Sequence, residues 1–257
     1  MSHYFFKYHG AGNDFILFDD RNGHFPESQE LVQHLCHRRF GIGSDGIMLI
    51  KHSEVADVHL DFINPDGSRS FCGNGSRCGL RFAESLGMIG STCSFEAIDG
   101  IHQGELTQDV VRISMRDVGE IRKHEKGDIL DTGSPHLIIR HENLTELDVN
   151  AKGSEIRYSP EFEKEGINVN FIESVDNKTI RIRTYERGVE GETLSCGTGV
   201  TAAALAFAEA NGITDGRVGV HSRGGDLSVE FKKEDGVFTS IWLIGPAEKV
   251  YAGEIHL

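Results

Sequence analysis

The sequence predicts an α+β protein made of two pseudo-symmetric mixed α/β domains related by an internal duplication. Two observations predict this fold. A motif of Gly, four residues and Cys-Gly-x-Gly occurs at residues 67–75 and again at residues 191–199. Each copy also lies between a strand-like and a helix-like stretch. A solenoid would need three or more short repeats, so two duplicated halves explain the pattern better.

Each motif follows a stretch with the composition of a β-strand. Residues 58–63 (Val-His-Leu-Asp-Phe-Ile) precede the first copy, and residues 179–185 (Thr-Ile-Arg-Ile-Arg-Thr-Tyr) precede the second. The second stretch alternates apolar with charged or polar residues, which is the pattern of a half-buried strand. We therefore expect a strand to lead into each motif.

Each motif is followed by a stretch that favours a helix. Residues 76–86 end at Gly87, a residue suited to the position just past a helix. Residues 200–210 are rich in alanine, the strongest helix former. Both stretches contain a Phe-Ala-Glu triplet, at residues 82–84 and 207–209. The two predicted helices are therefore counterparts.

The rest of each half is predicted to contain short strands. A polar, charged stretch near residues 119–128 predicts the boundary, which gives one half of residues 1–118 and another of residues 119–247. The further strand-like runs are residues 15–18, 47–50, 110–114, 136–139, 227–231 and 239–243.

The composition limits the classes of function. The chain has 26 Lys and Arg against 40 Asp and Glu, a net charge of −14. Nucleic acids and acidic membranes favour clustered positive charge, so we expect neither as a partner. The first residues lack the basic and apolar segments of a signal peptide, and no apolar run approaches the ~18 residues of a membrane span. We expect a cytoplasmic protein.

The five cysteines are Cys36, Cys72, Cys78, Cys93 and Cys196. An odd number without a secretion signal is typical of the reducing cytoplasm. The spacing lacks the close Cys pairs and neighbouring ligands of a zinc site, so we predict no metal site. We predict that Cys36, Cys78 and Cys93 are small buried structural residues.

The Cys-Gly-x-Gly motif places a thiol at the start of each predicted helix. There the unpaired backbone N–H groups and the positive end of the helix dipole lower the pKa of a thiol. The glycines remove side chains, so a carboxylate can approach these N–H groups. One such motif would more often be an inert capping turn, but two matching copies indicate chemistry at Cys72 and Cys196.

Two such sites facing each other across a cleft between the domains could act as a paired acid and base. One thiolate would remove the α-proton of an amino acid while the opposite thiol delivers a proton to the other face. Both sets of N–H groups would stabilise the charge that develops on the carboxylate, a task otherwise given to a pyridoxal cofactor. We therefore predict an epimerase that needs no cofactor, with Cys72 and Cys196 as catalytic residues.

Eight motifs in order along the chain carry a family resemblance. With these motifs the sequence resembles the diaminopimelate epimerase family. The motifs are at residues 7–15 (KYHGAGNDF), 41–46 (GIGSDG), 64–68 (NPDGS), 72–77 (CGNGSR), 133–136 (GSPH), 168–171 (NVNF), 185–188 (YERG) and 196–199 (CGTG).

The resemblance implies an isomerase that converts LL-2,6-diaminopimelate to meso-diaminopimelate in lysine and peptidoglycan precursor biosynthesis. It implies a cytoplasmic homodimer that uses neither pyridoxal phosphate nor a metal. It also implies that residues 248–257 return to the first half, and that the active site lies in the cleft between the halves.

The resemblance also implies the residues that bind the substrate. Arg187 suits the distal carboxylate of the substrate and Glu186 its ammonium group. His136 and Glu186 are the candidates for tuning the pKa of the cysteine pair. The full substrate-binding set is Asn13, Asn64, Gly73, Asn74, Asn168, Glu186, Arg187, Gly197 and Thr198.

Departures from the family pattern do not involve the cysteines. Many members have Asn where this chain has Ser134, some have Gln at Gly46, and Ala is frequent at Pro65. Without the family context, Asn13 and Asn64 would be interpreted as turn formers. Glu186 with Arg187 would likewise be a solvated pair, and His136 a buried core residue.

Four other functions account for only part of the sequence pattern. Proline and hydroxyproline racemases share the two-cysteine logic but need no group that binds a second amino-acid end. A phenazine-type isomerase of the same fold would lack the cysteine pair. A non-catalytic amino-acid binding module would leave the matching cysteines unexplained. A redox dithiol protein would require a stable disulfide between Cys72 and Cys196 as its working state.

Overall fold

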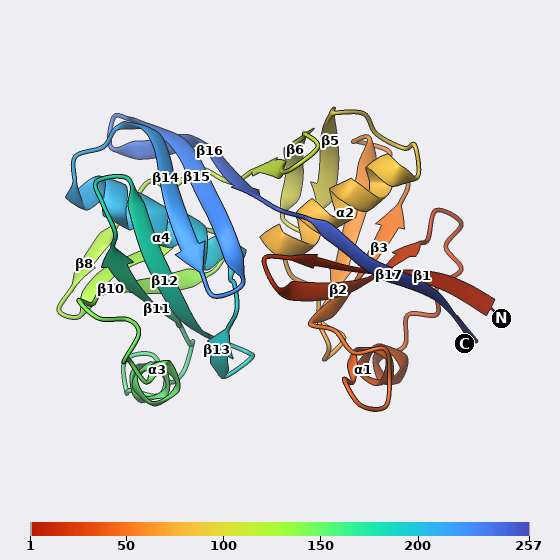
Figure 1. Ribbon diagram of the computed structural model, residues 1–257, viewed down its shortest axis with the longest axis horizontal. Helices are drawn as coiled ribbons and strands as arrows, with labels where there is room; N and C mark the ends of the chain where they lie inside the picture. The colour runs from red at the N-terminus through yellow and green to blue at the C-terminus, as the bar shows by residue number, and fades with distance from the viewer. Residues whose placement is uncertain (1, 257) are drawn as a thin grey trace. The chain divides into compact units, whose positions relative to one another are not determined.

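The computed structural model describes residues 2–256 and divides the chain into two compact units (Figure 1). Residues 2–113 with residues 245–256 form the first unit, and residues 114–244 form the second. The terminal segment therefore belongs to the unit that contains the N-terminus. None of the helices between residues 2 and 256 has the length and apolar character needed to cross a membrane.

The first unit is a mixed sheet with helices α1 and α2. Its strands pair in the order β7-β6-β5-β4-β3-β2-β1-β17. The pairs β2–β3 and β4–β5 are parallel and the others antiparallel. The elements are β1 (Ser2–Gly10), β2 (Asn13–Asp19), α1 (Gln29–Cys36), β3 (Gly46–Lys51), β4 (Val58–Ile63), α2 (Gly73–Ser85), β5 (Thr92–Ala97), β6 (Gly100–Leu106), β7 (Val111–Ser114) and β17 (Glu248–His256).

The second unit repeats this plan with helices α3 and α4. Its parallel pairs are β10–β11 and β12–β14. The elements are β8 (Arg122–His124), β9 (Gly127–Asp131), β10 (Pro135–Arg140), α3 (Val149–Arg157), β11 (Asn168–Ser174), β12 (Thr179–Glu186), β13 (Gly191–Thr193), α4 (Gly197–Ala210), β14 (Asp215–Ser222), β15 (Gly225–Glu234) and β16 (Val237–Gly245).

The order of elements shows the duplication directly. In the first unit α1 connects the parallel strands β2 and β3, and α2 connects β4 and β5. In the second unit α3 connects β10 and β11, and α4 connects β12 and β14. Parallel neighbours need such crossover connections, and both units place the longer helix at the second one. The predicted α+β fold of two like halves is confirmed.

In each unit the sheet carries a different helix on each face. In the second unit the α3 face is apolar and includes Leu137, Val169 and Phe171. The opposite face of the same strands bears His136, Asn168 and Asn170, because side chains alternate along a strand. Helix α4 packs against β10, β11 and β12 and is buried nearly all round. The polar residues of this face therefore lie under α4.

Helices α2 and α4 begin earlier than predicted, directly after Cys72 and Cys196. Glycine disfavours a helix interior, so the sequence pattern placed the start after the glycines. In the first turn, however, the backbone N–H groups have no partner within the helix and a side chain adds little. The glycines therefore belong to the helices, and each cysteine is the N-cap residue.

The polar stretch of residues 119–128 contributes to a hairpin of β8 and β9 within the second unit. The chain passes from the first unit to the second after Ile113 and returns after Ile244. The bounds predicted from the sequence, residues 1–118 and residues 119–247, remain a prediction for the functional halves.

Candidate active site

Cys72 caps helix α2 with its own side chain. The residue is extended, with φ −129° and ψ 105°, and its Sγ accepts the N–H of Gly75 at 3.4 Å. A Cβ atom at Gly75 would lie 3.3 Å from that Sγ and 3.2 Å from Cε of Met48. The thiol and a core side chain therefore leave little room for a side chain at Gly75, the last residue of the motif.

An amide network surrounds the Cys72 turn. Asn74 donates from Nδ2 to Oδ1 of Asn13 at 3.1 Å and accepts from the buried Arg77 at 2.8 Å. Asn13 donates from Nδ2 to Asp45 at 2.7 Å. The Oδ1 atom of Asn13, which lies 4.0 Å from Sγ of Cys72, is thereby directed towards the thiol. Burial lowers the pKa of Arg77 to about 10, so the guanidinium stays charged at neutral pH.

Charged residues hold Asp45 and the start of β2 in place. Arg38 donates to Asp14 and to Asp45, at 2.6 Å in each case. Lys7 pairs with Asp14 at 2.6 Å and also donates to the carbonyl of Gly43. Burial opposes the ionisation of Asp14, but the hydrogen bonds from Arg38 and Lys7 hold its pKa below the usual range. The network around Asn13 is thus anchored by ion pairs, among which Lys7 is buried and Arg38 and Asp45 are exposed.

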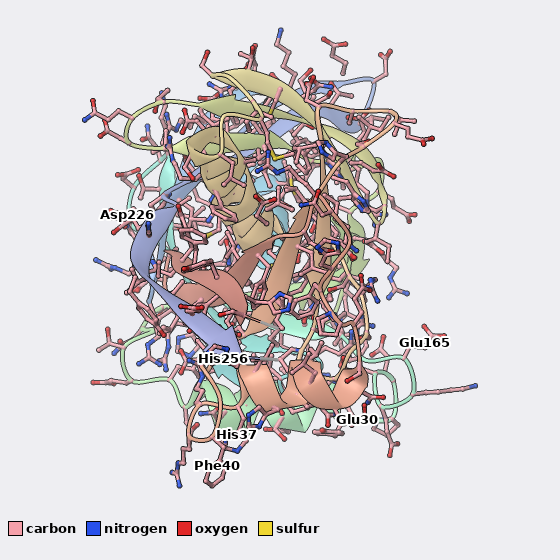
Figure 2. All side chains as sticks on the ribbon, turned by 90° about the vertical axis from the view of Figure 1, so that its right-hand side faces the viewer. Glu30, His37, Phe40, Glu165, Asp226 and His256 are labelled. Atoms are coloured by element: carbon pink, nitrogen blue, oxygen red, sulfur yellow. The ribbon has the colours of Figure 1, made fainter. Side chains whose placement is uncertain are left out.

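The loop that carries Arg38 also exposes an aromatic pair. The ring of Phe40 lies 4.7 Å from that of His37, and Phe40 is 76% exposed at the outer surface of the first unit (Figure 2). This pair points into solvent and does not contribute to the amide network.

Asn64 has different partners from the other predicted asparagines. Its Nδ2 donates to the Ser68 carbonyl at 3.2 Å and to Oγ of Ser70 at 3.0 Å. The backbone closes a turn here, with the N–H of Gly67 donated to the Asn64 carbonyl at 2.9 Å and Gly67 at φ +85°. The structure places Asn64 in this turn after β4 and outside the network that joins Asn13 and Asn74.

Cys196 caps helix α4 with nearly the same backbone but different neighbours. Its φ is −120° and its ψ is 111°, and its side chain makes no cap hydrogen bond to the helix. Its Sγ lies 3.5 Å from Oγ1 of Thr198. A Cβ atom at Gly199 would lie 2.6 Å from Oδ1 of Asn170 and 3.3 Å from Cε1 of His136. Asn170 and His136 therefore require glycine at this position.

His136 lies buried at the centre of a polar cluster below Cys196. Its Nε2 lies 3.0 Å from Oγ1 of Thr198 and 3.1 Å from Oγ of Ser134. Its Nδ1 lies 3.1 Å from Nδ2 of Asn170. Burial lowers the pKa of His136 to about 3, so the ring is neutral at physiological pH. Because the ring is neutral, it can affect Cys196 through hydrogen bonds and its dipole but not through a net charge.

Asn168 connects this cluster to the loop that carries Arg187. Its Oδ1 accepts the backbone N–H of Arg187 at 2.8 Å, and its Nδ2 donates to Oγ of Ser134 at 3.1 Å and the Pro135 carbonyl at 3.2 Å. The register of β10 and β11 sets His136 beside Asn168. Both ends of the amide are therefore fixed by the protein.

Glu186 and Arg187 lie at the end of β12. Glu186 is half-buried and pairs with Gly191 of β13. Arg187 is exposed and donates from Nη1 to the Glu165 carbonyl at 3.0 Å. A Cβ atom at Gly166, which has φ +76°, would lie 2.5 Å from Cδ of Arg187. The Arg187 stem therefore rests on a glycine backbone, with its guanidinium at the surface.

Three residues of the second-unit cluster were not singled out from the sequence. The sequence indicates Ser134 only as a departure from the family pattern, Asn170 only as part of the motif at residues 168–171, and Thr184 only as part of the strand-like stretch at residues 179–185. The signal that could have found Asn170 is its spacing of two from Asn168, since residues two apart on a strand share a face. The pairing of Thr184 with Asn170 follows from the register of β11 and β12.

The other three cysteines are buried within the first unit. Burial raises the pKa of Cys36, raises that of Cys93 to about 11, and raises that of Cys78 further. These thiols stay protonated at neutral pH, which suits the structural role predicted for them.

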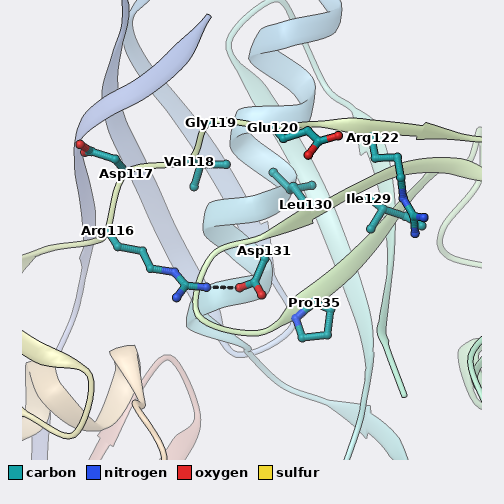
Figure 3. A pocket seen from close by; sticks show the side chains of 10 residues that line it. All are labelled: Arg116, Asp117, Val118, Gly119, Glu120, Arg122, Ile129, Leu130, Asp131 and Pro135. Atoms are coloured by element: carbon teal, nitrogen blue, oxygen red, sulfur yellow. Dashed lines mark hydrogen bonds and ion pairs between the residues drawn. The ribbon is translucent and has the colours of Figure 1, made fainter. Parts of the chain in front are cut away.

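A pocket of about 420 Å³ opens elsewhere on the second unit (Figure 3). An ion pair between Arg116 and Asp131 crosses it. Its lining comes from the segment before β8 and from β9 and β10, and includes Val118, Leu130 and Pro135. None of the predicted site residues lines this pocket, so it is distinct from the two Cys-Gly-x-Gly turns.

The fold is shared with solved structures. The phenazine biosynthesis protein of Bacillus anthracis, of the PhzF family, matches with a TM-score of 0.75 at 16% sequence identity, over 100% of both chains. At this identity the likeness shows the fold alone. Two like halves, each with a cysteine at the first turn of a buried helix, define a duplicated mixed α/β fold with one helix-capping thiol in each half.

The sequence comparisons identify the family. The family model described as diaminopimelate epimerase matches residues 5–122 and 129–250. The diaminopimelate epimerase of Flavobacterium psychrophilum is 43% identical over 96% of this chain and 97% of its own length. That of Chlorobaculum tepidum is 41% identical over 96% and 99%. The chain belongs to the diaminopimelate epimerase family and is an isomerase.

Proposed function

We propose that the protein interconverts LL-2,6-diaminopimelate and meso-diaminopimelate in lysine and peptidoglycan precursor biosynthesis, with Cys72 and Cys196 as acid and base. The observation that supports this most is the pair of N-cap cysteines. Each of the two segments that match the family model has one, at the first turn of a buried helix. Glycine follows each cysteine directly, so that position has no side chain that would block the approach of a carboxylate to the N–H groups of the helix start.

In the proposed reaction a thiolate removes the α-proton of the substrate and becomes a thiol. The opposite thiol gives its proton to the other face of the α-carbon and becomes a thiolate. The enzyme therefore ends the forward turnover with its proton on the other cysteine, and the reverse reaction uses each residue in the opposite role. The N–H groups at Gly73-Asn74 and Gly197-Thr198 stabilise the negative charge that the carboxylate gains.

The distal end of the substrate is assigned to residues beyond the two helix starts. Arg187 binds the distal carboxylate through its guanidinium, and Glu186 accepts from the distal ammonium group. Asn13, Asn64 and Asn168 supply amide hydrogen bonds. Asn13 and Asn168 are held by hydrogen bonds to Asp45 and to the backbone N–H of Arg187, which preorganises them.

The functional halves in this proposal are residues 1–118, completed by residues 248–257, and residues 119–247. We also propose a cytoplasmic homodimer. Light scattering coupled to size-exclusion chromatography measures the oligomeric state, and a monomer mass of 28.4 kDa would overturn the homodimer.

The test of the function is isotope exchange. The reduced protein is incubated with LL-diaminopimelate in deuterated water, with no cofactor added, and the α-carbon signals are followed by NMR. We expect deuterium at one α-carbon together with meso product. Exchange with proline or hydroxyproline instead would overturn the substrate and keep the cysteine pair. Absence of exchange with all three compounds would favour an amino-acid binding module.

A further inference from the structure

We infer that Asn170 is a positioning residue that holds His136 in the tautomer with its proton on Nε2 and thereby makes the Thr198 hydroxyl a donor to Cys196. The inference rests on the proposed role of Cys196 as an acid–base group. It assigns to Asn170, and to Thr184 behind it, a task that the sequence motifs do not indicate.

The first step is the orientation of the Asn170 amide. Its Oδ1 accepts the Thr184 hydroxyl at 3.0 Å. Its Nδ2 lies 3.3 Å from the Leu137 carbonyl and 3.3 Å from the Asn168 carbonyl. A carbonyl oxygen only accepts, so the amide nitrogen must be the atom on that side. Asn170 is fully buried, and reversing the amide would place two acceptors against its oxygen.

The second step is the tautomer of His136. The same Nδ2 atom lies 3.1 Å from Nδ1 of the His136 ring. The two N–H groups of this nitrogen are shared among three acceptors, and an amide nitrogen cannot itself accept a hydrogen bond. The Nδ1 atom that faces it must therefore be an acceptor, and a neutral imidazole then carries its single proton on Nε2. The charged groups that act on this ring are Asp131 of β9 and Arg187 after β12. They have opposite signs, and the hydrogen bonds of the ring go to Asn170 at Nδ1 and to two hydroxyl groups at Nε2, so the contact with Asn170 decides the tautomer.

The hydroxyl group of Thr198 lies among three hydrogen-bonding groups, those of Ser134, His136 and Cys196. Ser134 accepts from Asn168 and shares the Nε2–H of His136, at 3.1 Å in each case, which occupies both of its lone pairs, so its own hydroxyl proton goes to Oγ1 of Thr198 at 3.3 Å. The Nε2–H of His136 also donates to this Oγ1, at 3.0 Å. Both lone pairs of the Thr198 oxygen are then occupied. Its own proton is left for Sγ of Cys196 at 3.5 Å.

The consequence is a one-way series of hydrogen bonds that ends on Cys196. A donor aimed at sulfur stabilises the thiolate more than the thiol. With the other tautomer, Nε2 would accept from Ser134 or Thr198, and the Thr198 proton would no longer be committed to Cys196. Asn170 therefore acts on the thiol through two intervening side chains and touches neither substrate nor sulfur.

The tautomer is measured directly by NMR on the whole chain labelled with 15N-histidine. We expect Nε2 of His136 to show the shift of a protonated nitrogen and Nδ1 that of an unprotonated one, with His136→Gln identifying the signals. A protonated Nδ1 in the unmodified protein would overturn the inference, and this measurement needs no variant that must fold.

The variant that reverses the tautomer is Asn170→Asp, whose carboxylate can only accept from Nδ1. We expect His136 to move its proton to Nδ1. An unchanged tautomer in the folded variant would show that Asn170 does not control the ring. If Asn170→Asp fails to fold, Asn170→Leu removes the amide that faces Nδ1 and keeps the size of the side chain, and we expect a mixture of tautomers in place of one. A ring that stays entirely protonated on Nε2 in this variant would overturn the inference.

The effect on sulfur is measured with [3-13C]cysteine, whose Cβ signals report thiol and thiolate at each site. Thr198→Val should raise the pH midpoint of Cys196 by about one unit, a tenfold loss of thiolate below the midpoint, and leave Cys72 unchanged. Thr198→Ser, which keeps the hydroxyl, should restore it. Equal midpoints in the Val and Ser variants would refute the donor role. These readouts need no turnover, so they stand or fall separately from the epimerase activity.

Discussion

The Cys72 turn and the Cys196 turn have the same backbone and different hydrogen-bond partners. Their φ and ψ angles differ by less than 10°, at −129° and 105° against −120° and 111°. Around Cys72 the partners are amides anchored by ion pairs, among them Asn13 held by Asp45. Around Cys196 they are a hydroxyl and a neutral imidazole, those of Thr198 and His136.

The difference shows what the duplication kept and what it changed. Both halves keep the helix start, which supplies N–H groups for an anion. In the first half the sulfur accepts the N–H of Gly75 and also faces an acceptor, Oδ1 of Asn13. In the second half the sulfur makes no cap hydrogen bond to the helix, and a hydroxyl can donate to it. An acceptor favours the thiol and a donor favours the thiolate. We therefore expect the two cysteines to differ in their resting affinity for a proton.

The largest expected effect is the loss of either catalytic thiol. Cys72→Ala or Cys196→Ala should lower kcat by about 10³-fold, because general acid and base groups contribute on this order. Circular dichroism should show an unchanged fold. Cys93→Ala is the matched control, since that thiol is buried and protonated, and its kcat should stay within about twofold. A kcat within about tenfold of that of the unmodified protein, in either catalytic variant, would refute the paired mechanism.

A smaller effect is expected at the distal end of the substrate. Arg187→Ala should raise KM for diaminopimelate by about 10²-fold, because a charge-assisted pair is worth about 3 kcal/mol. Arg187→Lys keeps the positive charge but loses the two parallel N–H donors of the guanidinium. Its KM should therefore lie between those of the unmodified protein and Arg187→Ala. The control is the exposed Arg181 of β12, the strand that leads to Arg187, and Arg181→Ala should leave KM unchanged. An unchanged KM in Arg187→Ala would remove this residue from the site.

The two units should also differ in their response to acid. The pKa of His136 is about 3 in the folded chain against 6.5 for an ordinary histidine, so the unfolded chain binds the extra proton between these values. Stability of the second unit should therefore fall as the pH drops below about 6.5, by up to roughly 1.4 kcal/mol per pH unit.

The first unit should be affected only at lower pH. The pKa of Asp14 lies below 3.8, so its contribution is present above that value and lost as the pH falls through the folded pKa. Hydrogen exchange followed by mass spectrometry between pH 7 and pH 5 measures each unit separately. His136→Gln should flatten the pH dependence of the second unit. If that dependence is unchanged, His136 is not its source.

The smallest expected effect compares the equivalent glycines. Gly199→Ala should destabilise by about 1–3 kcal/mol, because its Cβ would lie 2.6 Å from the fully buried Asn170. Gly75→Ala should cost less, since the nearest atom is the flexible end of Met48 at 3.2 Å. Urea denaturation measures both variants. Equal destabilisation would mean that the second turn is no more tightly packed than the first.

Much of the plan could be predicted from the sequence. The repeated motif predicted two like halves, and the strands and helices around each copy were confirmed. These features are local, because strand alternation, helix propensity and glycine at a helix end depend on neighbours in the chain. The predicted helical stretches begin at residues 76 and 200, whereas the helices begin at Gly73 and Gly197. The difference arises because helix propensity disfavours glycine, although the first turn of a helix tolerates it.

What the sequence by itself determined was the duplicated fold, the helix-capping cysteines and the family. Only the tertiary structure decided which side chains meet them. Asn170 reaches His136 because β10 and β11 pair in one register, and Thr184 reaches Asn170 through the register of β11 and β12. A shift of one residue would turn these side chains to the other face. Register is set by the packing of the whole unit, so no local pattern contains it.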